Sequence, residues 1–274
     1  MAQEDEQSGG MQLVSKSMAI LKAIGQAGAI SVKELAERTG EPASSLYRLL
    51  SSLEAIGWVE PASKPRQVRL GVEFLRLGAR LEAQLDVRKQ ALPQLERLQQ
   101  LSGETAFLCI RRGLEAVCIE RVEGLDVQIH TLSLGQSMPL GEGVGPRAIL
   151  AFETKDVVDS YFQNFPAPTS AIAPSEKDLR VLLDETAGNG VAVATSEWAD
   201  GIGGVGAPIF DHRGRVVAAV SIGGMSHRMF GGRYDPVALI RAAAEVVSRS
   251  LGYDGDLPAA GPLPDGVREN IEVA

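Results

Sequence analysis

One stretch, from Glu41 to Gly57, constrains the fold of this chain more than any other, because its residues predict a short helix with two marked ends. Pro42 suits the first helical turn, where its missing N–H costs nothing, and Gly57 suits the left-handed position just past the last turn. The apolar residues between them recur at steps of three and four, which predicts one buried stripe along the helix. The stripe consists of Leu46, Leu49, Leu50, Leu53 and Ile56.

The other side of this helix carries short hydroxyl groups, a phenol and a guanidinium, from Ser44, Ser45, Tyr47 and Arg48. Such side chains hydrogen-bond phosphates and base edges in the major groove of DNA. A solvated helix surface carries the same residue types, so the helix taken alone fits both explanations equally. The segments on either side of it decide between them.

The segment before this helix predicts a second, shorter helix. Ser31 and Glu34 form a capping box, so a helix is expected over residues 32–39, ending at Gly40. About three residues then separate the two helices, which is the tight joint of a helix-turn-helix. A third amphipathic helix upstream is predicted by Val14, Met18, Leu21 and Ile24. Three short helices with a tight second joint favour a DNA-binding domain.

The segment after the helix, residues 58–70, contains two short β-prone pieces around a Pro-containing turn, the outline of a winged-helix hairpin. Lys64 and Arg66 near the tip are expected to contact backbone phosphates, as is Lys33 on helix 32–39. Such contacts add affinity and salt dependence but little sequence information. An ordinary solvated basic turn remains an alternative.

Charge is distributed unevenly along the chain. The whole sequence has a net charge of −8, which by itself argues against nucleic acid. Residues 11–80, however, carry ten Lys and Arg against six Glu, a net charge of +4, which leaves −12 on the remainder. A basic head on an acidic body is typical of a phosphate-binding module joined to a module that does not bind DNA.

Length and composition set broader limits. A chain of 274 residues with 45% hydrophobic and 23% charged residues is long enough for two folded domains. It contains no apolar run of the roughly 20 residues that cross a bilayer, and its acidic first residues do not form a signal peptide. We therefore expect a cytoplasmic protein without membrane contact, and disorder over the polar residues 1–10.

The cysteines and histidines provide no obvious chemistry. Cys109 and Cys118 lie in predicted neighbouring strands, so a disulfide is geometrically possible, although buried free thiols are favoured in a reducing compartment. Three histidines are scattered without metal-binding spacing, so we expect no metal. No catalytic motif occurs, and both thiols have apolar surroundings, so we expect no enzyme activity.

Beyond the head, the pattern predicts a linker helix over residues 71–84, a helix near 87–101, and then a mixture of strands and helices. Strands are expected at 105–111, 116–122, 127–132, 191–194, 205–210 and 216–222. Helices are expected at 145–153, 156–163, 176–188 and 236–251. This arrangement predicts an α+β fold with a largely antiparallel sheet over residues 85–253, followed by a flexible tail over 254–274.

Residues 201–206 match G-x-G-x-x-G, the fingerprint of a dinucleotide-binding turn. That fingerprint needs a strand before it and a helix after it, whereas polar residues precede this copy and β-prone residues follow it. We therefore expect no cofactor. The glycines are better explained by close backbone approach or a bulge.

Taken together, these parts resemble the IclR family of bacterial transcriptional regulators over roughly residues 12–253. Three groups of motifs carry the resemblance in order and spacing. They are residues 31–36 with 44–50 in the head, 69–71 with 75–78 in the linker, and 201–202 with 207–211 and Gly214 in the body. The resemblance implies an N-terminal winged helix-turn-helix over residues 11–70, the linker helix, and a C-terminal GAF-like domain that binds a small effector and forms a homodimer or homotetramer.

The resemblance also implies where the effector binds: Leu140, Gly143, Val144, Ala194, Ile202, Gly204, Ser221 and Gly223. This sequence departs from the family pattern in several places. It has Pro146-Arg147 where Gly-Lys is usual, and Ala194, Gly204 and Gly223 where Asp, Cys and Ser are common. Smaller and less polar residues favour a larger or aromatic effector over a two- or three-carbon acid.

We therefore interpret the chain as an effector-responsive regulator of catabolic or metabolic genes that binds a palindromic operator, with one recognition helix per half-site. A repressor is our default, because repression needs only occupancy of a promoter. Two alternatives stay open: an activator of the same family, and a ligand-sensing protein-interaction module whose head no longer binds DNA.

Overall fold

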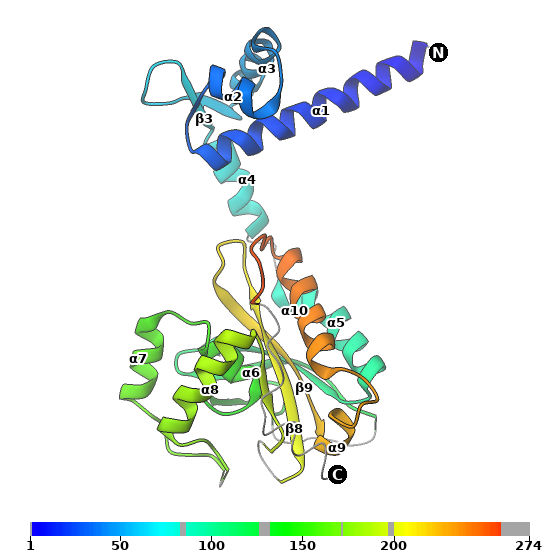
Figure 1. Cartoon of the computed structure of the whole chain (residues 1–274), viewed down its shortest axis with the longest axis vertical. Helices are drawn as coiled ribbons and strands as arrows, with labels where there is room; N and C mark the ends of the chain where they lie inside the picture. The colour runs from blue at the N-terminus through cyan, green and yellow to red at the C-terminus, as the bar shows by residue number, and fades with distance from the viewer. Residues whose placement is uncertain (1, 83–85, 126–131, 171, 197–199, 259–274) are drawn as a thin grey trace. The chain divides into compact units, whose positions relative to one another are not determined.

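The computed structural model describes residues 2–82, 86–125, 132–170, 172–196 and 200–258 (Figure 1). The chain divides into two compact units, Met1–Leu85 and Asp86–Ala274. Each unit has its own core of buried apolar side chains, with separate clusters around Leu35 and Leu140.

The first unit is a winged helix-turn-helix. Its helices are α1 (Ala2–Ala27), α2 (Val32–Thr39), α3 (Ala43–Ala55) and α4 (Glu73–Glu82). The short strands β1 (Ile30–Ser31), β2 (Val59–Pro61) and β3 (Gln67–Leu70) form an antiparallel sheet in the order β1-β3-β2. The strand β1 lies just before α2 and was not expected from the sequence, because two residues are too few to show an alternating pattern.

Four predictions for this unit need correction. Residues 2–10, which belong to the stretch expected to be disordered, form the start of helix α1. Val14 and Met18, expected in the buried stripe of that helix, are exposed, whereas Ile20 is buried. Pro42 is the residue before the first turn of α3 rather than within it, and Ile56 at the other end is exposed. The helix itself, and the left-handed Gly57 after it, are as predicted.

The second unit is an α+β domain around a six-stranded antiparallel sheet in the order β6-β5-β4-β9-β8-β7. Its strands are β4 (Thr105–Arg112), β5 (Glu115–Val122), β6 (Ser137–Pro139), β7 (Ala192–Ala194), β8 (Ile202–Phe210) and β9 (Val216–Met225). Its helices are α5 (Val87–Ser102), α6 (Val144–Leu150), α7 (Lys155–Gln163), α8 (Glu176–Asn189), α9 (Ser226–Met229) and α10 (Pro236–Ser250). The strand β6 was not predicted, and the predicted strand 127–132 lies outside the described residues except for Leu132.

Helices cover both faces of this sheet. Figure 1 shows α5 and α10 side by side on one side of β8 and β9, with α6 and α8 on the other, and the contacts between these elements agree. Because both faces are covered, β8 and β9 are buried almost throughout and their sequences are continuously apolar or small rather than alternating. Of the predicted flexible tail, residues 254–258 form no helix or strand, and 259–274 lie outside the described residues.

Candidate DNA-binding surface and effector pocket

Local hydrogen bonds fix the start of α2, which in turn positions the recognition helix α3. The Ser31 N–H donates to the Glu34 carboxylate at 3.1 Å, and the Glu34 N–H donates to the Ser31 hydroxyl at 3.3 Å, which completes the predicted capping box. The bond from the Ser31 N–H lowers the pKa of Glu34 below its usual value. At the other end Gly40 adopts φ 70°, which ends α2 and leaves a short turn before α3.

Helix α3 buries one side and exposes the other. Leu46, Leu50 and Leu53 enter the core of the first unit. The predicted DNA-contact residues of the helix, Ser44, Ser45, Tyr47 and Arg48, are all exposed. The apolar side of the helix is therefore packed in the core, and its polar side is accessible to a ligand.

A groove of about 540 Å³ lies between α1 and α3. Ser44, Ser45 and Arg48 line it together with Lys16 of α1, whereas Tyr47 lies outside its lining. Lys16 was not among the residues selected from the sequence, because nothing in the local pattern of α1 indicates which residues face α3. Its ammonium group pairs with Glu41 at 3.0 Å, which ties α1 to the turn before the recognition helix.

The wing presents the two predicted basic residues at its tip. Lys64 and Arg66 are both exposed, and Arg66 has a positive φ of 62°. The Ala62 N–H donates to the Gln67 carbonyl at 2.8 Å and closes the hairpin loop. Lys33 is exposed on α2, and like the wing residues it lies outside the groove lining. The basic residues thus occupy three places on the unit rather than one cluster.

In the second unit, antiparallel pairing brings the predicted effector residues of three strands together. Ala194 of β7 pairs with Gly204 of β8, and Gly204 pairs with Gly223 of β9. These three residues form one row across the sheet. Ser221 lies two residues from Gly223 on the same strand, and therefore on the same face.

Helix α6 packs directly on this row. A Cβ atom added to Gly204 would lie 2.9 Å from the Val144 Cγ2 atom, and one added to Gly145 would lie 3.0 Å from the Ser221 hydroxyl oxygen. Gly143 precedes the helix with φ 85°, in the left-handed region that favours glycine. The absence of side chains at these glycines is what allows helix and sheet to approach so closely.

Most of the predicted effector residues are buried. Leu140, Val144 and Ser221 are at most 5% exposed, whereas Ala194 and Ile202 are half-buried. Ala194 and Ile202 are thus the least buried of these residues. The segment 197–199 between them lies outside the described residues.

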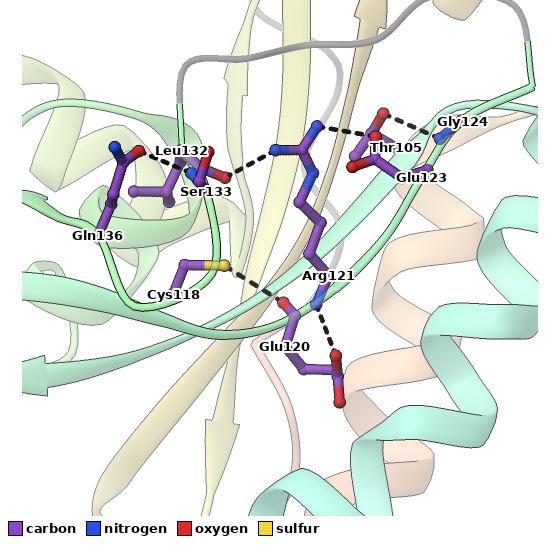
Figure 2. A network of polar contacts seen from close by, with 9 residues as sticks. All are labelled: Thr105, Cys118, Glu120, Arg121, Glu123, Gly124, Leu132, Ser133 and Gln136. Atoms are coloured by element: carbon purple, nitrogen blue, oxygen red, sulfur yellow. Dashed lines mark hydrogen bonds and ion pairs between the residues drawn. The ribbon is translucent and has the colours of Figure 1, made fainter.

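Two arginines next to this region were not among the residues selected from the sequence. Arg147, in the Pro146-Arg147 departure, is 3% exposed and donates to the Val193 carbonyl at 3.2 Å, which links α6 to β7. Arg121 lies at the centre of the polar network in Figure 2, where it donates to the Leu132 carbonyl at 3.3 Å and pairs with Glu123 at 2.8 Å. Nothing in the sequence pattern separates either arginine from the surface arginines.

Arg121 belongs to a second row across the sheet. It pairs in register with Phe107, which pairs with Ser221 on its other side. The Arg121 guanidinium also lies over the Phe107 ring, 5.4 Å from its centroid. An aromatic ring held under a cation thus lies beside the one hydroxyl among the predicted effector residues.

The two cysteines are buried free thiols, as favoured from the sequence. They pair in register on β4 and β5. The hydrogen bond with Cys118, together with burial, raises the pKa of the Cys109 thiol well above its usual value. A protonated, inaccessible thiol is a poor nucleophile.

Metal sites, dinucleotide-binding turns and membrane spans each have a recognisable structural signature. Among the described residues, no three His, Cys, Asp or Glu side chains are grouped as a metal site. The glycines of 201–206 lie at the start of strand β8 and lead into no helix, so the dinucleotide fingerprint is not formed. Within the described part of the chain no helix is both long and apolar enough to span a bilayer.

Comparison with known proteins identifies both units. Residues 13–63 match the family described as "IclR helix-turn-helix domain", and residues 80–249 match "Bacterial transcriptional regulator IclR C-terminal". The HTH-type transcriptional regulator KipR of Bacillus subtilis is 33% identical over 245 residues, 88% of this chain and 97% of that protein. The HTH-type transcriptional repressor AllR of Klebsiella pneumoniae is 30% identical over 260 residues, 91% of this chain and 93% of its own length.

Solved structures agree with this assignment. The crystal structure of Pseudomonas aeruginosa HmgR matches with a TM-score of 0.74 and 26% identity, over 89% of this chain and 99% of that one. These relatives are DNA-binding transcriptional regulators rather than enzymes. A winged helix-turn-helix with an exposed polar recognition helix, followed by an α+β domain, agrees with both family matches. The chain therefore belongs to the IclR family of bacterial transcriptional regulators.

Proposed function

We propose that this regulator is an effector-responsive repressor of catabolic or metabolic genes, acting as a homodimer or homotetramer on a palindromic operator. The observation that carries this proposal is the exposure of Ser44, Ser45, Tyr47 and Arg48 on a helix whose opposite side is locked in the core. The name of the AllR relative, a transcriptional repressor, favours repression over activation. Two-fold symmetry of the protein would match two-fold symmetry of the operator.

In this proposal the DNA contacts have two roles. Ser44, Ser45, Tyr47 and Arg48 contact base edges and nearby phosphates from the major groove, and Arg48 is the residue suited to a guanine. Lys33, Lys64 and Arg66 contact phosphates from α2 and the wing. Because phosphate contacts are the same for every sequence, they contribute affinity without choosing the site.

The effector contacts Leu140, Gly143, Val144, Ala194, Ile202, Gly204, Ser221 and Gly223. Ala194 and Ile202, the half-buried members, form its entrance, and Ser221 donates or accepts a hydrogen bond at its inner end. Val144 occupies the space beside Gly204, so a larger or aromatic effector binds only if that side chain moves. The Phe107 ring and the Arg121 guanidinium beside Ser221 favour an aromatic or acidic ligand over a small apolar one.

Effector binding reaches the DNA through α4, the linker helix. An effector changes operator affinity only by the difference between its affinities for the DNA-competent and DNA-incompetent arrangements. Residues 71–84 connect the two units along the chain, so in this proposal the difference is transmitted along this segment.

The test of DNA binding is fluorescence anisotropy with the DNA that flanks the protein's own gene, at two salt concentrations and with excess nonspecific competitor. Specific binding that weakens steeply with salt is the expected result. If specific binding is absent both without and with a metabolite extract from the cells, the head does not recognise DNA and the proposal fails.

The test of effector size is a thermal-shift panel of organic acids, because a ligand that binds only the folded state raises the melting temperature. Aromatic and larger carboxylic acids are expected to give the shifts. If only two- and three-carbon acids do so, the proposed size of the effector is wrong, whereas the DNA-binding proposal is unaffected.

A further inference from the structure

The second unit contains a cavity of about 290 Å³ that is separate from the effector row. It is bordered by the loop before α6, by α7, and by the segment that leads into α8. None of the eight proposed effector residues lines it, although Glu142 and Gly141 of its wall belong to the same loop as Leu140 and Gly143. Its volume lies at the lower end of the range for small-molecule sites.

A buried carboxylate on this wall lacks the partner that other buried carboxylates have. Glu104, Glu120 and Asp211 are each at most 8% exposed, and each lies within 3.5 Å of an arginine nitrogen. Glu142 is 6% exposed, yet no Lys, Arg or His among the described residues pairs with it. Within the described part of the chain, its oxygens accept hydrogen bonds only from the N–H of Thr169, at 3.0 Å, and from the hydroxyl of the same residue.

A buried charge raises the free energy of the folded state unless an opposite charge or several hydrogen bonds compensate it. Two neutral donors from one residue compensate Glu142 only in part. The amino-terminal end of α8 also borders the cavity and carries a partial positive charge. Other groups already compensate that partial charge, because the first turn of α8 contains the acidic Glu176 and Asp178 and is capped by Ser175.

The rest of the lining is aromatic and apolar. Tyr161 and Phe165 line the cavity with ring centroids 5.9 Å apart, and three prolines complete its wall. The Tyr161 hydroxyl accepts the Gly141 N–H at 2.9 Å, and burial followed by the negative charge of Glu142 raises its pKa. Electron-rich rings beside an uncompensated carboxylate attract cations rather than anions.

We propose that this cavity binds a small organic cation, a protonated amine with an apolar or aromatic body. The ammonium group pairs with the Glu142 carboxylate, and the body lies against Tyr161, Phe165 and the prolines. The site is independent of the effector pocket and of the identity of the effector.

The test compares two ligands of equal size that differ in charge. Benzylamine, protonated at neutral pH, and benzyl alcohol are titrated into the full-length protein by isothermal calorimetry. Benzylammonium is expected to bind at least about tenfold more tightly, because the alcohol leaves the buried carboxylate unpaired. Equal affinities, or no saturable binding of the amine at millimolar concentration, would overturn the proposal without needing any variant.

Two substitutions locate the site. Glu142→Gln keeps the shape and an acceptor for Thr169 but removes the charge, so the amine and the alcohol should then bind alike. The matched control is Glu185→Gln, an exposed residue of α8 outside the cavity lining, which should keep the preference for the amine. Circular dichroism establishes that both variants fold. An unchanged preference in a folded Glu142→Gln protein would place the amine elsewhere and refute the proposal.

Discussion

The close approach of Val144 to Gly204 can be tested by adding one methyl group. In the Gly204→Ala protein the new Cβ would lie 2.9 Å from the Val144 Cγ2 atom and 3.3 Å from the Ile222 carbonyl oxygen. The first distance is about 0.6 Å shorter than the roughly 3.5 Å at which two carbon atoms attract best. Both neighbours are buried, so the helix or the strand must shift. We expect the substitution to lower the free energy of unfolding by about 1–3 kcal/mol.

Val144→Ala provides the partner for a double-mutant cycle. Alone, it removes two buried carbon groups at about 0.8 kcal/mol each, plus a cavity term, so we expect a loss of about 2 kcal/mol. In the double variant the methyl group added at Gly204 occupies the space that the Val144 side chain vacated. The combined loss should therefore be smaller than the sum of the two single losses by about 1–2 kcal/mol.

The assay is calorimetric unfolding of the full-length chain, following the transition that the single substitutions shift. The same variants are then titrated with any effector found in the thermal-shift panel. Losses that add within about 0.5 kcal/mol would mean that Val144 and Gly204 do not contact each other in solution. The packing of α6 on the sheet, and the proposed need for Val144 to move, would then both be wrong.

Three further predictions concern other residues. Arg48→Ala should cost about 1–3 kcal/mol of operator affinity and relax specificity at one position of the operator. Lys64→Ala should weaken binding to all DNA sequences alike and reduce by about one the slope of log affinity against log salt concentration. If both substitutions cause equal losses of affinity for operator and random DNA, these roles are refuted. Ser31→Ala removes the cap of α2 and should lower the free energy of unfolding of the first unit by about 1 kcal/mol in urea unfolding, with Ser31→Thr as the control that restores it. Burial alone would raise the pKa of Asp211, but the hydrogen bonds from Arg215 and from nearby N–H groups outweigh burial and lower the pKa. The ionised carboxylate therefore stabilises the fold at neutral pH, and this stabilisation is lost as the pH falls through the lowered pKa. Asp211→Asn should therefore cost roughly 1–3 kcal/mol at pH 7 and progressively less in acid, and a pH-independent difference would contradict this.

Much of the first unit follows from patterns that span only a few residues. The Ser31–Glu34 capping box and Gly40 predicted α2 with both of its ends, and the apolar stripe with Gly57 predicted α3. The helix period also separated the exposed Ser44–Arg48 side from the buried leucines. These predictions succeeded because capping, left-handed glycines and helical periodicity depend on neighbouring residues alone.

Predictions failed where a distant segment decides the outcome. Val14, Met18, Leu21 and Ile24 fit the helical stripe of α1, but contacts with α2 and β3 bury only Leu21 and Ile24 of these four, together with Ile20. The strand β6 pairs with β5 over three residues, too short a span to give its own signal. In each case the sequence pattern allows several arrangements, and packing against another element selects one.

In the second unit, too, the sequence indicated candidate site residues, whereas the tertiary structure decided which of them lie together. The sequence, through its family resemblance, selected the glycines and Ser221, but the pairing of β7, β8 and β9 is what places Ala194, Gly204 and Gly223 in one row. Arg121 and Phe107 form a row with Ser221 only because β5 and β4 continue the same sheet. Glu142 is buried beside Tyr161 only in the folded chain, where no cation of the described residues pairs with it.

Local patterns in the chain were therefore enough to specify the helix-turn-helix, the polar side of its recognition helix and most of the strands and helices that follow. Folding in three dimensions then selected which helix faces are buried, how the effector row is assembled and that Glu142 is buried without a cationic partner among the described residues. The physical reason is range: hydrogen bonds at helix ends and backbone sterics act within a few residues, whereas burial and charge pairing depend on segments far apart in the chain.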